Sequence, residues 1–136
     1  METTVFTVLV QPGDCGPDGI VLVHNFTRWM DAASQHYFGE RGVPQGYRMT
    51  DPRVRLCTQT LELQVRFNAP ATHPDVLRFH TRIDEWRAEI FYQSHRVMRG
   101  DTLIGEGRET REFCCLDADG LLRPLPVPPW IRSRCH

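Results

Sequence analysis

The feature that most constrains the fold is a change in the spacing of apolar residues along the chain. Across residues 25–38 they recur at steps of three and four, as one face of an α-helix requires. Across residues 61–67 they alternate strictly with charged and amide side chains, which is typical of a half-buried strand. Strand-like stretches follow at residues 77–84, 88–98 and 103–115. One helix followed by a run of strands favours an antiparallel sheet packed on that helix over alternating βαβ units.

The predicted helix has recognisable ends. Asn25 is a good N-cap residue, and Gly39 and Gly42 supply the stop. Residues 43–52 are rich in Gly and Pro and are expected to be irregular. The helix is therefore expected to begin at Asn25 and to end near Gly39.

Segments at the two ends of the chain complete the expected sheet. Residues 3–10 are β-branched and aromatic enough to form a first strand. Asp119 and Gly120 predict a hairpin turn, and the Pro-rich residues 124–129 are expected to form a terminal strap. Because 136 residues can bury one proper core, we expect a single α+β domain over residues 1–136.

Composition excludes several classes of function. A formal net charge of -1 gives no global basic field for a nucleic acid, so none is expected as a partner. All 16 basic residues are Arg, which excludes lysine Schiff-base chemistry. The five cysteines form no C-x-x-C pair and match no His spacing, so neither a disulfide framework nor a zinc site is indicated.

The sequence also carries no signal for a membrane or an export pathway. No stretch approaches the roughly 20 apolar residues that a membrane helix needs, and no basic segment followed by a long apolar run opens the chain. We therefore expect no membrane association and a reducing, cytoplasmic location.

The loop before the helix and the start of the helix resemble one known family. Residues 13–21 read Gly-Asp-Cys-Gly-Pro-Asp-Gly-Ile-Val, and Arg-Trp-Met-Asp-Ala-Ala-Ser follows at residues 28–34. Both segments resemble hotdog-fold acyl-CoA thioesterases of the 4-hydroxybenzoyl-CoA thioesterase type. The resemblance implies a hotdog fold, in which a five- or six-stranded antiparallel sheet wraps around a long central helix. It also implies a homodimer or homotetramer with active sites between subunits.

The resemblance further implies which residues carry out the chemistry. Cleavage of a thioester needs a carboxylate or an activated water, and donors aimed at the carbonyl oxygen. The backbone N–H groups of Val23 and His24, at the helix start, are the implied oxyanion donors. The family's catalytic Asp falls on Gly16, which has no side chain. The candidate catalytic carboxylates are therefore Asp18 first, because it lies nearer the helix, and Asp14 second.

Each candidate also has a structural interpretation. Asp18 lies in a Pro-Asp-Gly sequence, where Asp commonly bonds its own backbone in a turn, and Asp14 matches a family residue that holds the loop. Asp31, on the helix, is a third candidate. His24 fits a partly exposed helix-entry position better than an acid-base role. Cys15 fits a small buried loop residue better than a thiol nucleophile.

Two residues are candidates for substrate binding. Arg87 matches a basic run that contacts the nucleotide end of coenzyme A in the family, and Arg can hold phosphates by paired hydrogen bonds. A solvated charge at a strand edge is the alternative. Trp29 could line an acyl pocket, although apolar residues at helical spacing are more often core.

The leading hypothesis is hydrolysis of an acyl-CoA or aroyl-CoA thioester. Coenzyme A is then part of the substrate, and no cofactor or metal is expected. One alternative is a hydrolytically impaired hotdog protein that binds an acyl thioester, because the catalytic position is Gly16. Another is a dehydratase-like hotdog enzyme, in which His24 and Asp18 would move protons.

Overall fold

The computed structural model describes residues 2–43, 53 and 55–136, so most of the segment expected to be irregular lies outside the described residues. Its elements are β1 (Thr4–Leu9), the 3-10 turn η1 (Pro12–Asp14), α1 (Val23–Glu40), β2 (Arg55–Phe67), β3 (Val76–Trp86), β4 (Ile90–Arg99), β5 (Thr102–Leu116), β6 (Leu122–Pro124) and α2 (Pro129–Arg134). The predicted order of one strand, one long helix and consecutive strands is confirmed. No helix in these ranges is long and apolar enough to span a membrane.

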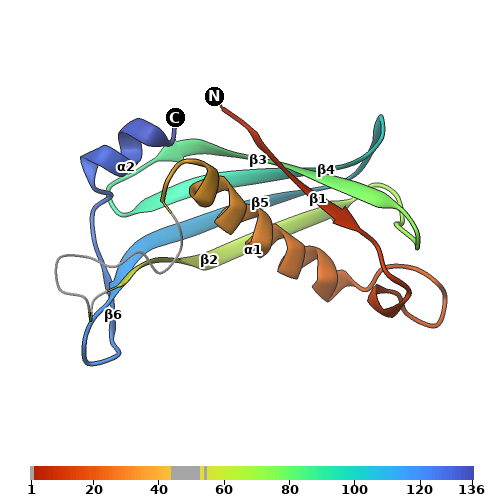
Figure 1. The fold of residues 1–136 in the computed structure, drawn as a ribbon, viewed down its shortest axis with the longest axis horizontal. Coiled ribbons are helices and arrows are strands. Elements are labelled where there is room, and N and C mark those ends of the chain that lie inside the picture. The colour runs from red at the N-terminus through yellow and green to blue at the C-terminus, as the bar shows by residue number, and fades with distance from the viewer. Residues whose placement is uncertain (1, 44–52, 54) are drawn as a thin grey trace.

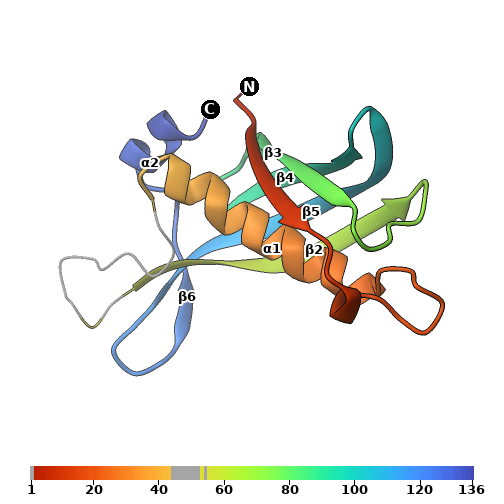
Figure 2. The same cartoon turned by 45° about the vertical axis from the view of Figure 1, so that its right-hand side comes forward.

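The strands form a six-stranded antiparallel sheet in the order β1-β3-β4-β5-β2, with β6 beside the end of β5. The sheet curls around α1, which lies along one of its faces (Figures 1 and 2). The predicted α+β fold, a long helix wrapped by an antiparallel sheet, is confirmed.

The apolar face of α1 is the centre of the core. The helix buries the apolar residues that the periodicity selected: Phe26, Trp29, Met30, Ala33, Tyr37 and Phe38. Where α1 crosses β5 the two backbones lie so close that a Cβ on Gly107 would be 2.5 Å from Met30 Sδ. Glycine at this position therefore lets the helix pack directly on the sheet.

The C-terminal tail differs from the prediction. The Asp119–Gly120 turn is confirmed, with Gly120 at φ +81° and β6 paired to β5. The segment expected to be a simple strap leads instead into α2, which has Pro129 in its first turn and buries Ile131. Six residues are too few to show helical periodicity, so the pattern could not indicate this helix.

The outer edge of β2 is unpaired in the described structure, and the strand carries exposed apolar side chains. β2 is the last strand of the sheet, and within the described ranges no strand pairs with its outer edge. Leu61 and Phe67 are 53% and 42% exposed along this strand. A long edge with exposed apolar side chains is a ready template for pairing with another chain.

Candidate active site

The loop between β1 and α1 is held in shape by Asp14. Its Oδ2 accepts a hydrogen bond from the Gln11 backbone N–H at 2.8 Å. Its backbone carbonyl accepts the Leu22 N–H at 3.0 Å and the Asn25 side-chain amide at 2.8 Å. Its Oδ1 also lies 3.6 Å from Arg28 Nη2. Asp14 thus ties the start of the loop to the start of the helix, which is the structural role considered for it above.

Asp18 lies at the tip of this loop, beside Gly16. Backbone hydrogen bonds from Gly16 N–H to the Ile20 carbonyl and from Gly19 N–H to the Gly16 carbonyl fold the tip back on itself. Asp18 Oδ1 accepts the Ile20 N–H at 3.0 Å. A Cβ on Gly16 would lie 3.3 Å from this oxygen and 3.1 Å from Leu22 Cδ2. The Asp18 carboxylate therefore fills space into which a side chain at position 16 would project.

The start of α1 presents unpaired amide groups. The helix begins at Val23, with Leu22 as an extended N-cap that makes no side-chain cap. Within the described part of the chain, the backbone N–H groups of Val23 and His24 have no acceptor. The prediction of Asn25 as N-cap is wrong, because Asn25 lies within the first turn and its side-chain amide donates to the Asp14 carbonyl instead. The helix dipole adds partial positive charge beside the free amides.

An apolar groove opens beside the helix start. It has a volume of about 350 Å³, and its walls come from the helix start, the preceding loop and the segment after β2. The lining residues are Ile20, Val21, Val23, Phe26, Phe67, Asn68, Ala69, Pro70 and Ala71. The Phe26 and Phe67 ring centroids are 5.0 Å apart, which joins α1 to the end of β2. Free amides at the mouth of an apolar groove can polarise a carbonyl whose acyl chain lies in the groove.

The remaining candidates of the helix and loop occupy distinct positions. Asp31 is exposed on α1 and lies 3.4 Å from Arg111 Nη2. His24 is exposed at the helix start, and the described structure contains no hydrogen bond or ion pair that joins it to Asp18. Cys15 is half-buried, with its Sγ 3.8 Å from the Gln11 carbonyl oxygen. The His24–Asp18 pair of the dehydratase hypothesis is thus not assembled within one chain.

Neither of the two predicted substrate-binding residues lines the groove. Trp29 is 7% exposed and makes edge-on ring contacts with Phe26 and Phe79, so it belongs to the core below the groove. Phe26 lines the groove in its place. Arg87 lies just after β3, at the end of the sheet near α2, where its carbonyl accepts a hydrogen bond from Arg132 (Figure 1). The length of β3, roughly 35 Å at about 3.3 Å per residue, separates it from the loop.

A buried polar network, which the sequence patterns did not indicate, lies between the sheet and α1. His95 and Glu109 are buried, with His95 Nε2 2.5 Å from Glu109 Oε2. Glu109 Oε1 accepts hydrogen bonds from Arg111 Nη1 and Thr60 Oγ1, each at 3.0 Å. Thr81 Oγ1 contacts the other His95 ring nitrogen at 2.7 Å. The signal for this network in the sequence is the presence of polar side chains at inward-facing positions of otherwise apolar strands.

Two contacts connect this region of the sheet to the helix. Arg111 reaches Asp31 on α1, and Ser34 Oγ donates to Gln93 Oε1 at 2.7 Å. Ser34 and Gln93 are both buried, and Gln93 Nε2 has no partner in the described structure. Because an unpaired charge is costly in a buried site, removal of any member of the Arg111–Glu109–His95 group would leave the others unsatisfied between the sheet and α1.

The network makes stability depend on pH. Burial alone would raise the pKa of Glu109, but the hydrogen bond with His95 and the charge of Arg111 outweigh it and hold this pKa below its usual range. Such a carboxylate stabilises the fold above its unfolded-state pKa, and this contribution is lost as the pH falls through the folded-state pKa. We therefore expect the free energy of unfolding of the wild type to fall below about pH 4, and more steeply than that of Glu109→Gln. Urea unfolding from about pH 7 to about pH 3 measures both. Parallel curves for the two proteins would contradict the assignment.

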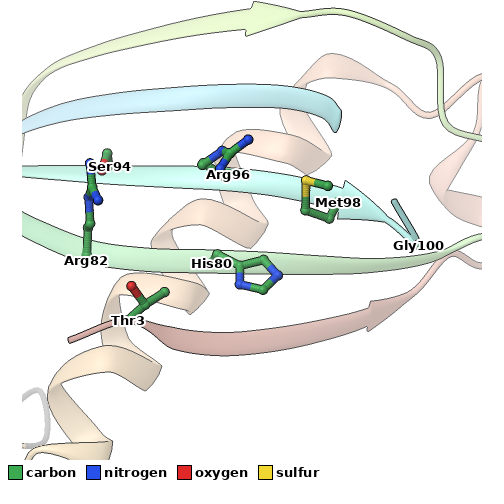
Figure 3. A pocket seen from close by; sticks show the side chains of 7 residues that line it. All are labelled: Thr3, His80, Arg82, Ser94, Arg96, Met98 and Gly100. Atoms are coloured by element: carbon green, nitrogen blue, oxygen red, sulfur yellow. The ribbon is translucent and has the colours of Figure 1, made fainter. Parts of the chain in front are cut away.

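A second depression lies on the opposite face of the sheet. It has a volume of about 410 Å³ and is bordered by His80, Arg82 and Arg96, on the sheet face turned away from α1 (Figure 3). Arg82 Nε is paired with Asp84 Oδ1 at 2.8 Å, and Arg96 lies 3.8 Å from a carboxylate oxygen of Glu106. The sheet itself separates this depression from the helix start. Among residues 2–43, 53 and 55–136, no three potential metal ligands come together.

Comparison with known proteins gives matches along nearly the whole chain. The sequence profile of the thioesterase-like superfamily matches residues 10–135. The 4-hydroxybenzoyl-CoA thioesterase of Pseudomonas sp. (strain CBS-3) is 37% identical over 124 residues, which cover 88% of this chain and 87% of that protein.

Solved structures agree with these matches. The three-dimensional structure of the 4-hydroxybenzoyl-CoA thioesterase from the same Pseudomonas strain has a TM-score of 0.87 and 33% identity, and covers 99% of this chain and 100% of that chain. A mutant 4-hydroxybenzoyl-CoA thioesterase complexed with 4-hydroxybenzoyl-CoA has a TM-score of 0.88 and 32% identity, and covers 98% of this chain and 99% of that chain. The structural matches therefore span nearly the whole chain, including the loop before α1 and the start of that helix.

Proposed function

The chain belongs to the thioesterase-like superfamily, and from this premise we propose that it hydrolyses the thioester bond of an acyl- or aroyl-coenzyme A. The family predicted from residues 13–34, hotdog thioesterases of the 4-hydroxybenzoyl-CoA type, is confirmed. Thioester hydrolysis is the activity named for relatives that match along nearly the whole chain. The observation that carries the proposal is that Asp18 contacts Ile20, which lines the apolar groove together with Val23, whose backbone N–H is unpaired in the described structure.

In the proposed reaction the acyl group lies in the groove and its carbonyl oxygen accepts hydrogen bonds from the Val23 and His24 amides. The Asp18 carboxylate takes a proton from water, whose oxygen bonds to the carbonyl carbon. The C–S bond then breaks, and coenzyme A leaves as the thiol with that proton. The amides stabilise the charge that develops on the carbonyl oxygen, which is usually the largest single contribution of this kind of site. Water is the only co-reactant, so no cofactor is required.

Asp18 is favoured over Asp14 because of their contacts. Both oxygens of Asp14 are engaged, one by the Gln11 N–H and one by Arg28, and its side chain is only 17% exposed. Asp18 is exposed, and only its Oδ1 has a partner in the described structure. Asp18 therefore has an oxygen free to act on water, whereas Asp14 shapes the loop.

The proposal is tested with a panel of purified thioesters. Benzoyl-type, short aliphatic and long aliphatic coenzyme A thioesters are incubated with the protein, and chromatography separates free coenzyme A from intact substrate. We expect release from the benzoyl-type members, because the relatives are named for 4-hydroxybenzoyl-CoA. Absence of release from every member, at substrate concentrations that saturate binding, would contradict the proposal.

A second candidate function is binding without hydrolysis. Gly16 lacks a side chain, and Asp18 Oδ1 is already bonded to the Ile20 amide in a turn. These observations favour a protein that retains the groove and the amides but has lost its catalytic carboxylate. The same panel distinguishes the two candidates, because a carrier or sensor would give saturable binding and an intact thioester.

We also propose that the active unit is a homodimer joined through the outer edges of two β2 strands, or a tetramer built from such dimers. Antiparallel pairing about a two-fold axis would place the start of one β2 beside the end of the other. The end of β2 at Phe67 forms a wall of the groove. The partner subunit would then cover the groove and bring Arg87 of the partner subunit from the far end of its sheet towards the substrate.

Leu61→Asp tests this arrangement. The substitution places a charge on the exposed edge of β2, and we expect it to weaken association at least about tenfold because burial of a leucine side chain is lost. Light scattering over a concentration series measures the dissociation. Leu121→Asp is the matched control, since Leu121 is 54% exposed but lies in the β5–β6 turn. A monomeric wild type, or equal weakening by both variants, would contradict the β2 interface.

A cytoplasmic location is part of the proposal as well. All five cysteines are free thiols, including two whose sulfur atoms lie 3.0 Å apart without a bond. Five free cysteines without a C-x-x-C pair support residence in a reducing compartment. Coenzyme A thioesters as substrates are consistent with the same location.

A further inference from the structure

We infer that Cys57 and Cys114 form a reversible oxidation site, at which a peroxide converts two adjacent thiols to a disulfide that joins β2 to β5. The inference concerns a different place from the proposed active site and does not depend on it. It rests on the register of the two strands, the contact between the sulfur atoms and the unequal exposure of the two residues.

The two cysteines face each other across neighbouring strands. Cys57 of β2 is the register partner of Cys114 of β5. Their Sγ atoms are 3.0 Å apart, and Cys114 Sγ also lies 3.4 Å from the Cys57 carbonyl oxygen. Directly opposed residues of an antiparallel pair have Cα atoms about 4.5–5.5 Å apart, which falls within the range that disulfides span. Closing the bond therefore needs an approach of only about 1 Å by side chains that already point at each other.

The other cysteines do not compete for this pairing. Cys115 follows Cys114, so its side chain points to the other face of the sheet. Cys15 lies in the loop before α1, and Cys135 is buried at the end of α2. The described structure therefore brings together one specific pair among five thiols.

The environments of the two thiols assign them different roles. Cys57 is half-buried and accessible to a small oxidant, whereas Cys114 is fully buried. Burial, together with the contact with Cys57 and the nearby Glu112 carboxylate, raises the pKa of Cys114 to about 12. Because it is the more exposed member of the pair, Cys57 is the thiol that meets the oxidant first, and Cys114 gives up its proton only as its sulfur attacks Cys57.

The reaction consumes one peroxide for each pair. The Cys57 sulfur, as its thiolate, attacks one peroxide oxygen; the O–O bond breaks and gives a sulfenic acid at Cys57, and the released hydroxide becomes water with the proton that the thiol lost. The Cys114 sulfur then attacks the Cys57 sulfur. The S–O bond breaks, and the departing hydroxide takes the Cys114 proton as a second water. Two thiols and one peroxide thus yield one disulfide and two waters.

The position of the bond determines its effect. Cys57 lies near the beginning of β2, next to Thr58, whose hydroxyl accepts a hydrogen bond from Arg111. A covalent link here would fix the beginning of this edge strand to β5. Because a disulfide restricts the unfolded chain, we expect oxidation to raise the Tm on the order of 5–10 °C.

The test uses the full-length protein in its native assembly. Wild type is treated with hydrogen peroxide, its remaining thiols are alkylated under denaturing conditions, and peptide mapping locates any cross-link. We expect one link between Cys57 and Cys114, loss of two of the five alkylatable thiols, a chain that migrates as a monomer on a non-reducing gel, and reversal by dithiothreitol.

Variants keep the result interpretable. Cys57→Ser, at the half-buried position, is expected to abolish the link, and Cys115→Ser, on the other face of β5, is expected to retain it. Circular dichroism of each variant checks its fold. Over-oxidation of Cys57 to the sulfinic acid without a link would overturn the inference. A link that involves Cys15, Cys115 or Cys135, or one between two chains, would do the same.

Discussion

Asp18→Asn is expected to lower the rate of thioester hydrolysis at least about 100-fold, because a positioned general base contributes a factor of that size or more. Asparagine keeps the hydrogen bond that Asp18 Oδ1 accepts from the Ile20 amide, so the loop should keep its shape. The amides of Val23 and His24 and the apolar groove are untouched. We therefore expect substrate affinity to change little and the loss to fall on kcat, measured by steady-state release of free coenzyme A.

Asp14→Asn is the matched control for this variant. Its amide oxygen can still accept the Gln11 N–H, and the lost ion pair with Arg28 is long, at 3.6 Å, with Arg28 64% exposed. Such a pair contributes less than about 1 kcal/mol, so turnover should stay within about threefold of wild type. Loss of turnover in Asp14→Asn with retention in Asp18→Asn would reverse the assignment.

A second pair of variants tests whether a carboxylate at position 16 can replace the carboxylate at position 18. Asp18→Ala removes the carboxylate, and Gly16→Asp in the same chain returns one from the neighbouring position. A Cβ at position 16 would lie 3.3 Å from the present Asp18 Oδ1, and the nearest obstacle, at 3.1 Å, is the end of the flexible Leu22 side chain. We expect the double variant to be at least about tenfold more active than Asp18→Ala alone. No recovery in a folded double variant would show that the two positions are not interchangeable.

Glu109→Gln is expected to lower the free energy of unfolding by about 3–5 kcal/mol, the usual effect of removing one partner from a buried ion pair. Glu109 is the acceptor shared by His95, Arg111 and Thr60. Glutamine has one acceptor oxygen and no charge, so the buried Arg111 would keep its hydrogen bonds to the neutral Thr58 and Thr60 hydroxyls but only a long contact with one carboxylate, that of Asp31. The expected loss is large beside the 5–15 kcal/mol that holds an ordinary domain together.

Urea unfolding at neutral pH measures this effect. Glu106→Gln is the control on the same strand, since its side chain is 48% exposed and lies 3.8 Å from Arg96. The control should change stability by less than about 1 kcal/mol. Equal stability of Glu109→Gln and wild type would mean that the network contributes no net free energy to the fold.

Much of the fold could be predicted because the sequence patterns are long and strong. The helix has six apolar residues on one face, and all of them are buried. Alternation identified the strands, although β2 begins at Arg55, before the strict pattern starts. The order of these elements was enough to exclude a parallel sheet. The family could be predicted only from the resemblance in residues 13–34, because periodicity does not identify a family.

Features that depend on contacts between distant residues could not be predicted. Asn25 looks like an N-cap in isolation, but the loop places the Asp14 carbonyl beside its amide and the helix begins earlier. The His95–Glu109 pair unites β4 and β5 across 14 residues of sequence, and each residue alone reads as a polar interruption of a strand. The nearness of Asp18 to Gly16 depends on the fold of the loop tip.

The most direct test of the account is a single-turnover measurement with excess protein and 4-hydroxybenzoyl-CoA. A rapid quench followed by chromatography separates coenzyme A from the intact thioester. We expect stoichiometric release by the wild type, and release at least about 100-fold slower by an Asp18→Asn variant that binds the substrate equally well. Full binding by the wild type with the thioester left intact would contradict it.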